Sequence, residues 1–262
     1  MPHIIILEEK IMDSFISWVG GKKLLRHKII NEFPEKETFN RYIEVFGGAG
    51  WVLFAADKHA KLEVYNDING NLVNLFKCTK YHPDALQTEL EYILMSREQF
   101  WDARKQMDVA GLTDIQRAAR FFVVIKESFG ADMHSFCLKS RNMEKTIDYI
   151  TSISKRLNTV VIENLDFEHI LKTYDRNETL FYLDPPYYGA EKYYKIAFAQ
   201  GEHIRLKTAL DKINGRFILS YNDCEFVREL YKEYNMIEIY RMSNLVKKDK
   251  KPRYKELLIK NY

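Results

Sequence analysis

The sequence contains few of the residues that build disulfide scaffolds and metal centres. Its three cysteines, Cys78, Cys137 and Cys224, lie far apart and form no CxxC motif, which indicates reduced thiols in a cytoplasmic protein. The seven histidines are scattered, and none pairs with another at the spacing of metal ligands. We therefore expect neither a disulfide framework nor a bound metal.

Long apolar runs are also missing. No segment approaches the roughly 18 apolar residues of a membrane helix, and residues 1–13 hold one short apolar block followed by two glutamates, unlike a secretory signal. There is no internal repeat and no low-complexity linker. The 262 residues, 46% of them hydrophobic, are enough for one large α/β domain with an insertion or for two small domains.

Positive charge is concentrated near one end of a chain whose net charge is only +3. The segment 247–255 carries six basic residues and one acid, so the remainder is slightly acidic. Such a segment suits contact with phosphates, although a solvated hairpin loop would have the same composition.

The most informative motif is Leu-Asp-Pro-Pro-Tyr at 183–187. It follows the apolar run 179–183, which reads as a buried strand. Pro185 and Pro186 remove two backbone donors and hold the chain extended, which leaves the carboxylate of Asp184 and nearby carbonyls as acceptors. Beside them, Tyr187 offers a ring for stacking. This cluster suits a flat group that carries an exocyclic amino group, such as a nucleobase.

A second motif predicts a nucleoside site. The strand 41–46 is followed by Gly47-Gly-Ala-Gly50 and by an expected helix over 51–59; a second strand, 62–66, ends at Asp67. An acid at this place reaches the ribose hydroxyls of a nucleoside in a doubly wound sheet. Leu53 stands where a diphosphate-binding fingerprint needs glycine, so the motif favours a cofactor without a diphosphate, such as S-adenosylmethionine, over a nicotinamide dinucleotide.

Two further pairs are candidates for the same cofactor. Gly20 and Gly21 precede a helical pattern over 22–33, where free N–H groups would favour a carboxylate, and Trp18 could stack on a ligand. Asp166 and Phe167 follow the strand 159–162 and could hold an adenine by its amino group and its face, although a helix cap and a core residue would look the same.

About ninety residues separate the second and third strands, far more than a crossover requires. Helices are expected over 69–79, from Pro83 toward 107, after a Thr113 cap, and up to 157, with an irregular polar and aromatic segment at 130–142. We expect residues 68–157 to be a helical insertion, and 14–67 with 158–262 to form one catalytic domain. Later come a helix over 202–212, the strand 216–220, a helix capped by Asp223, and two closing strands at 236–240 and 256–259.

Five motifs in this order resemble the DNA adenine-N6 methyltransferases of the Dam type. They are Trp18-Val-Gly-Gly-Lys22, Glu44-Val-Phe-Gly-Gly-Ala-Gly50, Asn66-Asp-Ile-Asn69, Asp184-Pro-Pro-Tyr187 and Leu219-Ser-Tyr-Asn-Asp223. The resemblance implies an α/β fold, a seven-stranded Rossmann-like methyltransferase sheet with a mostly helical target-recognition insertion. It implies transfer of a methyl group from S-adenosylmethionine to N6 of a flipped adenine in double-stranded DNA, by a cytoplasmic enzyme of a bacterium or phage that is a monomer or weak dimer.

The resemblance also implies roles for individual residues. The catalytic set is Asp184, Pro185, Pro186 and Tyr187. The cofactor set is Trp18, Gly20, Gly21, Lys22, Phe46, Gly47, Gly48, Ala49, Gly50, Asp67, Asp166, Phe167 and Asp184. Residues expected to contact DNA are Lys139, Arg141, Tyr188, Lys192, Tyr193, Tyr194, Asn222, Lys247, Lys248, Lys250, Lys251 and Arg253.

One departure from the family pattern and two rival functions stay open at the level of sequence. Family members that read GATC carry an Asn-Gly-rich, Arg-containing segment where this chain has Ser128-Phe-Gly-Ala-Asp-Met-His-Ser-Phe136, so the recognition sequence is not implied. Cytosine N4 methylation uses a similar acceptor cluster. A catalytically silent DNA-binding protein on the same fold would keep the sheet and the basic segment.

Overall fold

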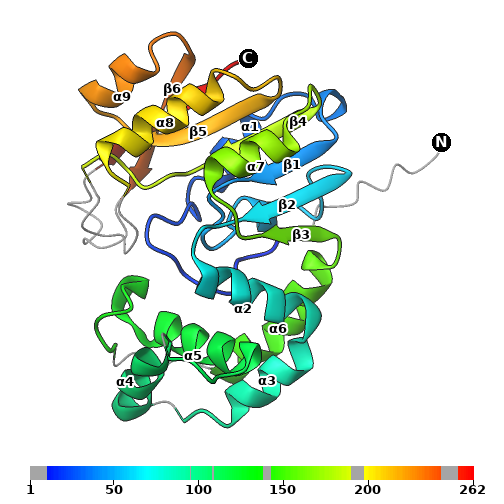
Figure 1. Cartoon of the computed structure of the whole chain (residues 1–262), viewed down its shortest axis with the longest axis vertical. Helices are drawn as coiled ribbons and strands as arrows, with labels where there is room; N and C mark the ends of the chain where they lie inside the picture. Colours follow the sequence, from blue (N-terminus) through cyan, green and yellow to red (C-terminus); the bar gives the residue numbers. More distant parts are fainter. Residues whose placement is uncertain (1–10, 95, 108, 138–142, 190–197, 243–252) are drawn as a thin grey trace, which may run out of the picture.

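A single twisted sheet organises the molecule (Figure 1). The computed structural model describes residues 11–94, 96–107, 109–137, 143–189, 198–242 and 253–262. Within these residues the sheet has seven strands in the order β3-β2-β1-β4-β5-β7-β6. Their bounds are β1 Arg41–Glu44, β2 Leu62–Asn66, β3 Val160–Glu163, β4 Thr179–Leu183, β5 Arg216–Asn222, β6 Asn235–Met242 and β7 Arg253–Lys260. The predicted seven-stranded α/β fold is therefore confirmed.

The sheet is parallel from β3 to β5 and ends in an antiparallel hairpin. Strand β7 lies between β5 and β6 and is antiparallel to both. The chain passes from β1 to β2 on one side and returns to β4 on the other, so the switch point of the topology lies between β1 and β4. In open α/β sheets, ligands bind beside the carboxyl ends of the strands at such a point.

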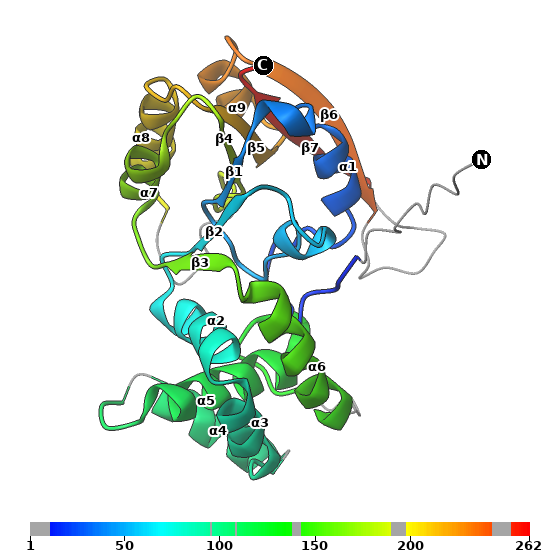
Figure 2. The same ribbon diagram turned by 90° about the vertical axis from the view of Figure 1, so that its right-hand side faces the viewer.

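Alternating side chains of the strands build a core on each face of the sheet. Ile43, Phe181 and Leu219 belong to the core under α7 (Phe167–Tyr174), α8 (Gln200–Leu210) and α9 (Glu225–Leu230). Tyr42, Tyr182 and Ile218 belong to the core on the opposite face, which includes α1 (Arg26–Asn31). Figure 2 shows α7 and α8 on one side of the sheet and α1 on the other.

Between β2 and β3, the described residues form five α-helices, which lie together beyond the edge of the sheet (Figures 1 and 2). They are α2 Gly70–Tyr81, α3 Pro83–Glu91, α4 Arg97–Gln106, α5 Asp114–Glu127 and α6 Met143–Leu157. Asn69 caps α2 through its side chain, and Thr113 forms a capping box with Gln116 at the start of α5. Their apolar faces join the core on the α1 side of the sheet. None of the described helices is long and apolar enough to cross a membrane.

Four expectations about helices were wrong. The expected helix over 51–59 is a 3-10 turn, Leu53–Ala55. The buried Arg156 side chain donates hydrogen bonds to the carbonyls of Leu53 and Ala56, and the backbone becomes extended at Ala56, so the helix does not continue. The segment from Pro83 toward 107 forms two helices, because Ser96 caps a new one.

The other two differences are smaller. The helix expected from 22 begins at Arg26, after a turn whose N–H groups bond back to the Lys22 carbonyl. Cys224, not Asp223, is the N-cap residue of α9, since the Asp223 carboxylate is bonded to Arg228 and Lys255. These differences leave the strand order unchanged.

Candidate active site

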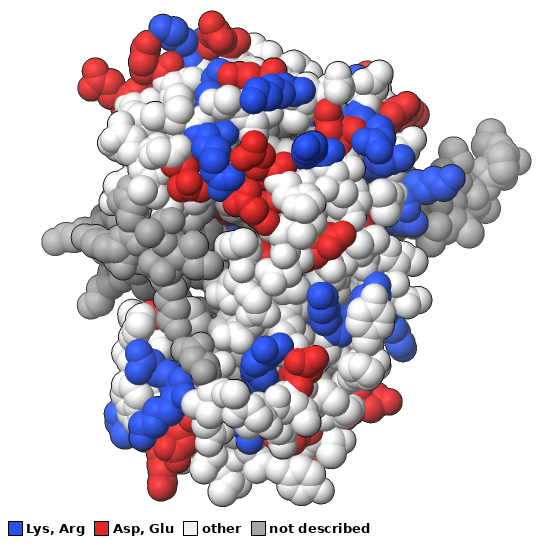
Figure 3. Space-filling model, viewed as in Figure 1, with Lys and Arg blue, Asp and Glu red and all other residues white. Residues whose placement is uncertain are grey.

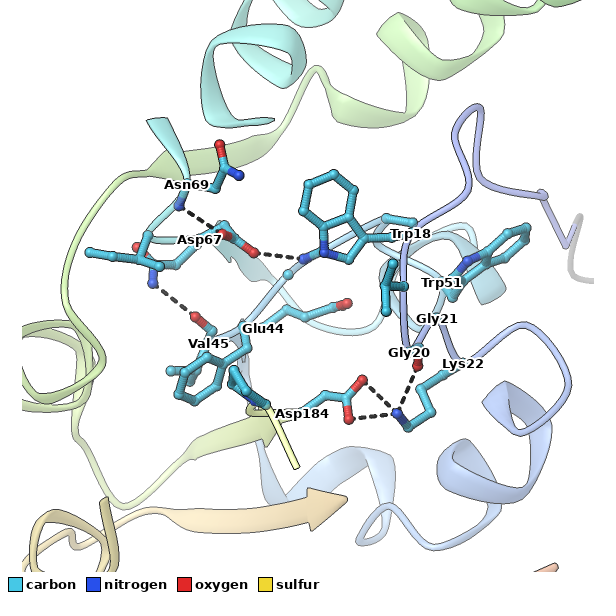
Figure 4. A pocket seen from close by; sticks show the side chains of 18 of the residues that line it. Trp18, Gly20, Gly21, Lys22, Glu44, Val45, Trp51, Asp67, Asn69 and Asp184 are labelled. Carbon is cyan, nitrogen blue, oxygen red and sulfur yellow. Dashed lines mark hydrogen bonds and ion pairs between the residues drawn. The ribbon is translucent and has the colours of Figure 1, made fainter. Parts of the chain in front are cut away.

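A cavity of about 400 Å³ lies at the carboxyl ends of β1, β2 and β4 (Figure 4). The glycine turn after β1, the loop after β2 and Asp184 after β4 all line it, as do residues 18–22 from the N-terminal segment. The volume is within the roughly 300–1,000 Å³ typical of small-molecule sites. The fold thus brings together motifs that are up to 166 residues apart in the chain, at the switch point of the sheet.

The glycine turn must lack side chains because aromatic rings pack against it. A Cβ on Gly47 would lie 2.2 Å from the Tyr65 ring, and a Cβ on Gly48 would lie 3.0 Å from the Trp18 indole. Gly48 and Gly50 also adopt positive φ, which side chains disfavour. The hydroxyl of Tyr65 donates to the Gly48 carbonyl over 2.7 Å. The half-buried Trp18 therefore lies over the turn and forms a wall of the cavity, beside Ala49.

Asp67 holds this turn against the start of α2. Its two carboxylate oxygens accept N–H groups from Gly48, over 2.9 Å, and from Asn69, over 2.8 Å (Figure 4). Burial raises the pKa of Asp67, and these backbone donors oppose that rise. An ionised carboxylate has about four acceptor sites, so Asp67 retains the capacity to accept from a ligand hydroxyl.

Asp166 is a helix cap, and its side chain also belongs to the lining of the cavity. It caps α7 by accepting the Glu168 N–H, and it lines the cavity together with Phe167 and Phe46. Arg205 of α8 donates to both of its carboxylate oxygens over 2.8 Å, which lowers the pKa of Asp166. The Arg205 guanidinium also covers the Phe167 ring at 3.9 Å, and that ring is buried.

The N-terminal glycines line the cavity, but the expected free N–H groups at a helix start are not there. Gly20 and Gly21 lie several residues before the six-residue α1, and the Gly21 N–H donates to the Trp18 carbonyl. A Cβ on Gly21 would lie 2.8 Å from the Trp51 indole nitrogen, so glycine serves close packing there.

Within residues 18–22, Lys22 forms an ion pair with Asp184. Its buried Nζ lies 2.6 Å from Oδ1 and 2.7 Å from Oδ2 of that carboxylate, and donates to the Gly20 carbonyl over 2.9 Å. Figure 4 shows the ammonium beside both oxygens. Pro186 lines the cavity next to this ion pair, and Pro185 is buried behind it.

Tyr187 is fixed through its hydroxyl. The O–H donates to Oε2 of Glu256 in β7 over 2.6 Å, and the ring stacks on Tyr221 at 5.9 Å between centroids. Burial, Asp184 and Glu256 together raise the pKa of Tyr187 well above 10, so the hydroxyl remains a donor. The structure thus brings all four residues of the Asp-Pro-Pro-Tyr motif to the sheet edge beside the cavity.

The side chains of the site that were not among the residues expected from the sequence include Glu44, Arg205 and Glu256. Glu44 ends β1, lines the cavity and accepts from the Tyr42 hydroxyl over 2.8 Å. Burial and the neighbouring Asp184 raise the pKa of Glu44 to about 8. The acid before the glycine turn was part of a recognised motif, so its position was a usable signal; Arg205 and Glu256 carry none.

The helical insertion also contributes to the cavity wall, through residues 131–134. Ala131 and Met133 adopt positive φ, and Arg104 of α4 donates to the Met133 carbonyl over 2.9 Å. Asp132 accepts the N–H groups of His134 and Ser135 and so closes the turn. Part of the irregular segment expected at 130–142 thus faces the cavity.

Of the residues expected to contact DNA, two have described side chains. Tyr188 is half-buried; its ring stacks on Phe226 at 4.2 Å, and Asn222 donates to its carbonyl. The others lie outside the described residues, or, for Arg253, outside the described side chains: Lys139, Arg141, Lys192, Tyr193, Tyr194, Lys247, Lys248, Lys250 and Lys251.

Comparison with known proteins agrees with this site. The profile of the D12 class N6 adenine-specific DNA methyltransferases matches residues 18–245, which include every motif of the cavity. The chain belongs to this family. It is an adenine-specific DNA methyltransferase, as the resemblance of its motifs predicted.

Two relatives extend along almost the whole methyltransferase. A type II methyltransferase, M1.LlaDCHI of Lactococcus lactis, is 27% identical and covers 95% of each chain. A DNA adenine methylase of Haemophilus influenzae is 22% identical over 93% of this chain and 92% of its own. A solved precorrin 8W decarboxylase of Methanobacterium thermoautotrophicum superposes with a TM-score of 0.42 at 12% identity, covering 91% of this chain and 89% of its own.

Proposed function

We propose that the cavity binds S-adenosylmethionine and that Asp184 and the Pro185 carbonyl receive the amino group of an adenine flipped out of double-stranded DNA. The observation that carries this is the position of Asp184: it directly follows β4, the strand paired with β1, and it lines the same cavity as Asp67. A cofactor bound along the turn would therefore meet a target at Asp184. The family makes methyl transfer to adenine N6 the reaction.

The residues present fit a nucleoside cofactor with an amino acid tail. Glycines clear the backbone beneath Trp18, and two carboxylates line the cavity, Asp67 and Asp166. In this proposal Asp67 accepts ribose hydroxyls, and Asp166 with Phe167 and Phe46 holds the adenine. The ionised state of Asp166, supported by Arg205, suits an acceptor for an amino group. The methionine tail then lies toward residues 18–21.

S-adenosylmethionine bound here supplies an electrophilic methyl group. The chain's own task is to present a poor nucleophile, because the lone pair of an adenine amino nitrogen is delocalised into the ring. Asp184 and the Pro185 carbonyl accept the two N–H groups, which favours pyramidal nitrogen and stabilises the positive charge that grows there. Positioning supplies much of the remaining acceleration. No base is needed before attack, since the proton becomes acidic only once nitrogen is methylated.

The target base cannot reach this site within a stacked duplex. Enzymes that modify a base extrude it at a cost of a few kcal/mol, and we propose that Tyr187, fixed by Glu256, stacks on the extruded adenine. Residues 68–157 would then be the target-recognition insertion of a chain acting as a monomer or weak dimer. Basic side chains gather at the lower left of Figure 3, over α4, which carries Arg97, Arg104 and Lys105. Together with the segment 247–255 they would contact phosphates.

Replacing Asp184 with alanine tests this assignment. We expect Asp184→Ala to bind S-adenosylmethionine measurably by isothermal titration calorimetry and to lose transfer of labelled methyl to DNA by roughly 10²-fold or more, the cost of removing a group aimed at developing charge. Asp57→Ala changes an exposed carboxylate away from the cavity and serves as the matched control. Mass spectrometry of the digested nucleosides identifies the product. Undiminished transfer by Asp184→Ala would refute its catalytic role, and N4-methylcytosine would refute adenine as the target.

A further inference from the structure

Lys22 binds the Asp184 carboxylate, the acceptor that the amino group of the proposed target requires. Its ammonium lies within 2.7 Å of both carboxylate oxygens of Asp184 and 4.8 Å from the centre of the Tyr187 ring. An adenine amino group that donates to Asp184 and a base that stacks on Tyr187 would enter the same space. The Lys22 ammonium donates to the Asp184 carboxylate, as the amino group of the target base would do after it enters.

The charge of Lys22 also opposes the reaction where it now lies. Asp184 is proposed to stabilise positive charge on the reacting nitrogen, and a cation held against both of its oxygens offsets that effect. The Lys22 side chain is 4% exposed, so solvent screens its charge little. A productive complex therefore requires Lys22 to leave Asp184, and a buried ammonium must then find another anion.

Glu256 is that second anion. Its Oε2 lies 4.0 Å from the Lys22 Nζ and accepts the Tyr187 hydroxyl as well. Glu256 is 3% exposed, and β7 holds it in register opposite Asn222 of β5. The Gly20 carbonyl, which already accepts from Nζ over 2.9 Å, remains available during such a shift.

We propose that Lys22 holds the place of the target amino group in the free enzyme and moves from Asp184 to Glu256 when the base arrives. Lys22 is then a positioning residue of the target site and not a cofactor contact, and Glu256 is the counterion that receives it. This inference rests on the proposed binding of the target at Asp184. It assigns two buried side chains to which the sequence motifs gave no such role.

A pair of variants tests the transfer of the ammonium. Glu256→Gln keeps an acceptor for the Tyr187 hydroxyl but removes the charge that receives Lys22. We expect single-turnover methylation at saturating S-adenosylmethionine to slow roughly 10- to 100-fold, the effect of losing one hydrogen bond to a charged group. Lys22→Met then removes the cation that needs a partner. We therefore expect the double variant Lys22→Met/Glu256→Gln to be about tenfold faster than Glu256→Gln alone.

Controls separate this effect from damage to the fold or to the cofactor site. Lys61→Met and Glu178→Gln change exposed residues that precede strands β2 and β4, at the opposite edge of the parallel sheet. S-adenosylmethionine titration of every variant should give the wild-type affinity. Loss of that affinity in Lys22→Met would make Lys22 a cofactor contact and overturn the proposal.

The remaining outcomes are equally distinct. A double variant no faster than Glu256→Gln would show that Glu256 acts by supporting structure alone, and would overturn the proposal while wild-type methylation stood. A Glu256→Gln variant as fast as wild type would overturn it as well. Failure of the proposed function would differ, because the wild-type protein itself would then transfer no methyl group to DNA.

Discussion

Glu44 is a carboxyl group kept from water beside a second carboxyl group, Asp184. Its raised pKa, about 8, means that the folded protein binds a proton there between pH 4.5 and 8, while the unfolded chain, with the ordinary value of 4.5, does not. Because the folded state binds more protons than the unfolded state in this window, the free energy of unfolding falls as the pH rises. Glu44 therefore reduces stability as pH rises through this window.

Substituting Glu44 should reveal that dependence. We expect the free energy of unfolding of Glu44→Gln to increase relative to that of wild type as the pH rises from about 5 to 8. The total increase should be a few kcal/mol, because a difference of one pKa unit between the folded and unfolded states is equivalent to about 1.4 kcal/mol. The gain should level off above pH 8. Urea unfolding at several pH values measures it. A difference that is the same at pH 5 and pH 8 would contradict the raised pKa.

At the scale of residues, the sequence predicted those residues of the site that belong to a local sequence motif. Asp184, Asp67 and the glycines of 47–50 each follow a strand in the sequence and line the cavity in the structure. Arg205 and Glu256 could not be found this way. Arg205 acts on Asp166 and Glu256 acts on Tyr187, and only the fold brings these distant partners together.

Among the elements, α6 has an unusual role, because it joins the helical insertion to the sheet through one buried ion pair. Arg156 donates to both carboxylate oxygens of Glu63 in β2 over 2.8 Å, and to the carbonyls of Leu53 and Ala56. The insertion is thus bonded to the turn that follows the glycines of the cavity. The sequence predicted a helix over 51–59, because the hydrogen bonds from the distant Arg156 to these carbonyls form only in the folded structure.

Removing this arginine should cost much of the protein's stability. We expect Arg156→Met to lower the free energy of unfolding by about 3–5 kcal/mol, since Glu63 is then left buried without its cation. Lys155→Met, one residue earlier and exposed, is the control and should change it by less than about 0.5 kcal/mol. Denaturant titration gives both values. Equal effects of the two substitutions would mean that the ion pair does not anchor the insertion.

Taken as a whole, the molecule is close to neutral, so its attraction to DNA depends on where the charge lies. Lys247, Lys248, Lys250 and Lys251 belong to the most basic segment of the sequence. Neutralising all four should reduce the slope of log affinity against log salt by up to about 3–4, at about 0.9 for each phosphate that these lysines neutralise. Fluorescence anisotropy with a duplex at several salt concentrations measures the slope.

The matching control replaces four exposed lysines at the opposite edge of the parallel sheet: Lys58, Lys61, Lys172 and Lys212. It removes the same charge from the molecule but not from the segment, and should leave the slope near that of wild type. Two slopes that fall equally would mean that overall charge, and not the segment, determines the salt dependence.

The strand order determines when during synthesis this protein can become an enzyme. Strand β6 is made before β7 but lies outside it, so β6 joins the sheet only through a strand that does not yet exist. Glu256, the partner of Tyr187, is in that same late strand. A nascent chain that has not reached β7 therefore carries the glycine turn and Asp184 but lacks the Glu256 carboxylate that fixes Tyr187. Translation products that stop before residue 253 should therefore be inactive, so DNA would not be modified by incomplete chains.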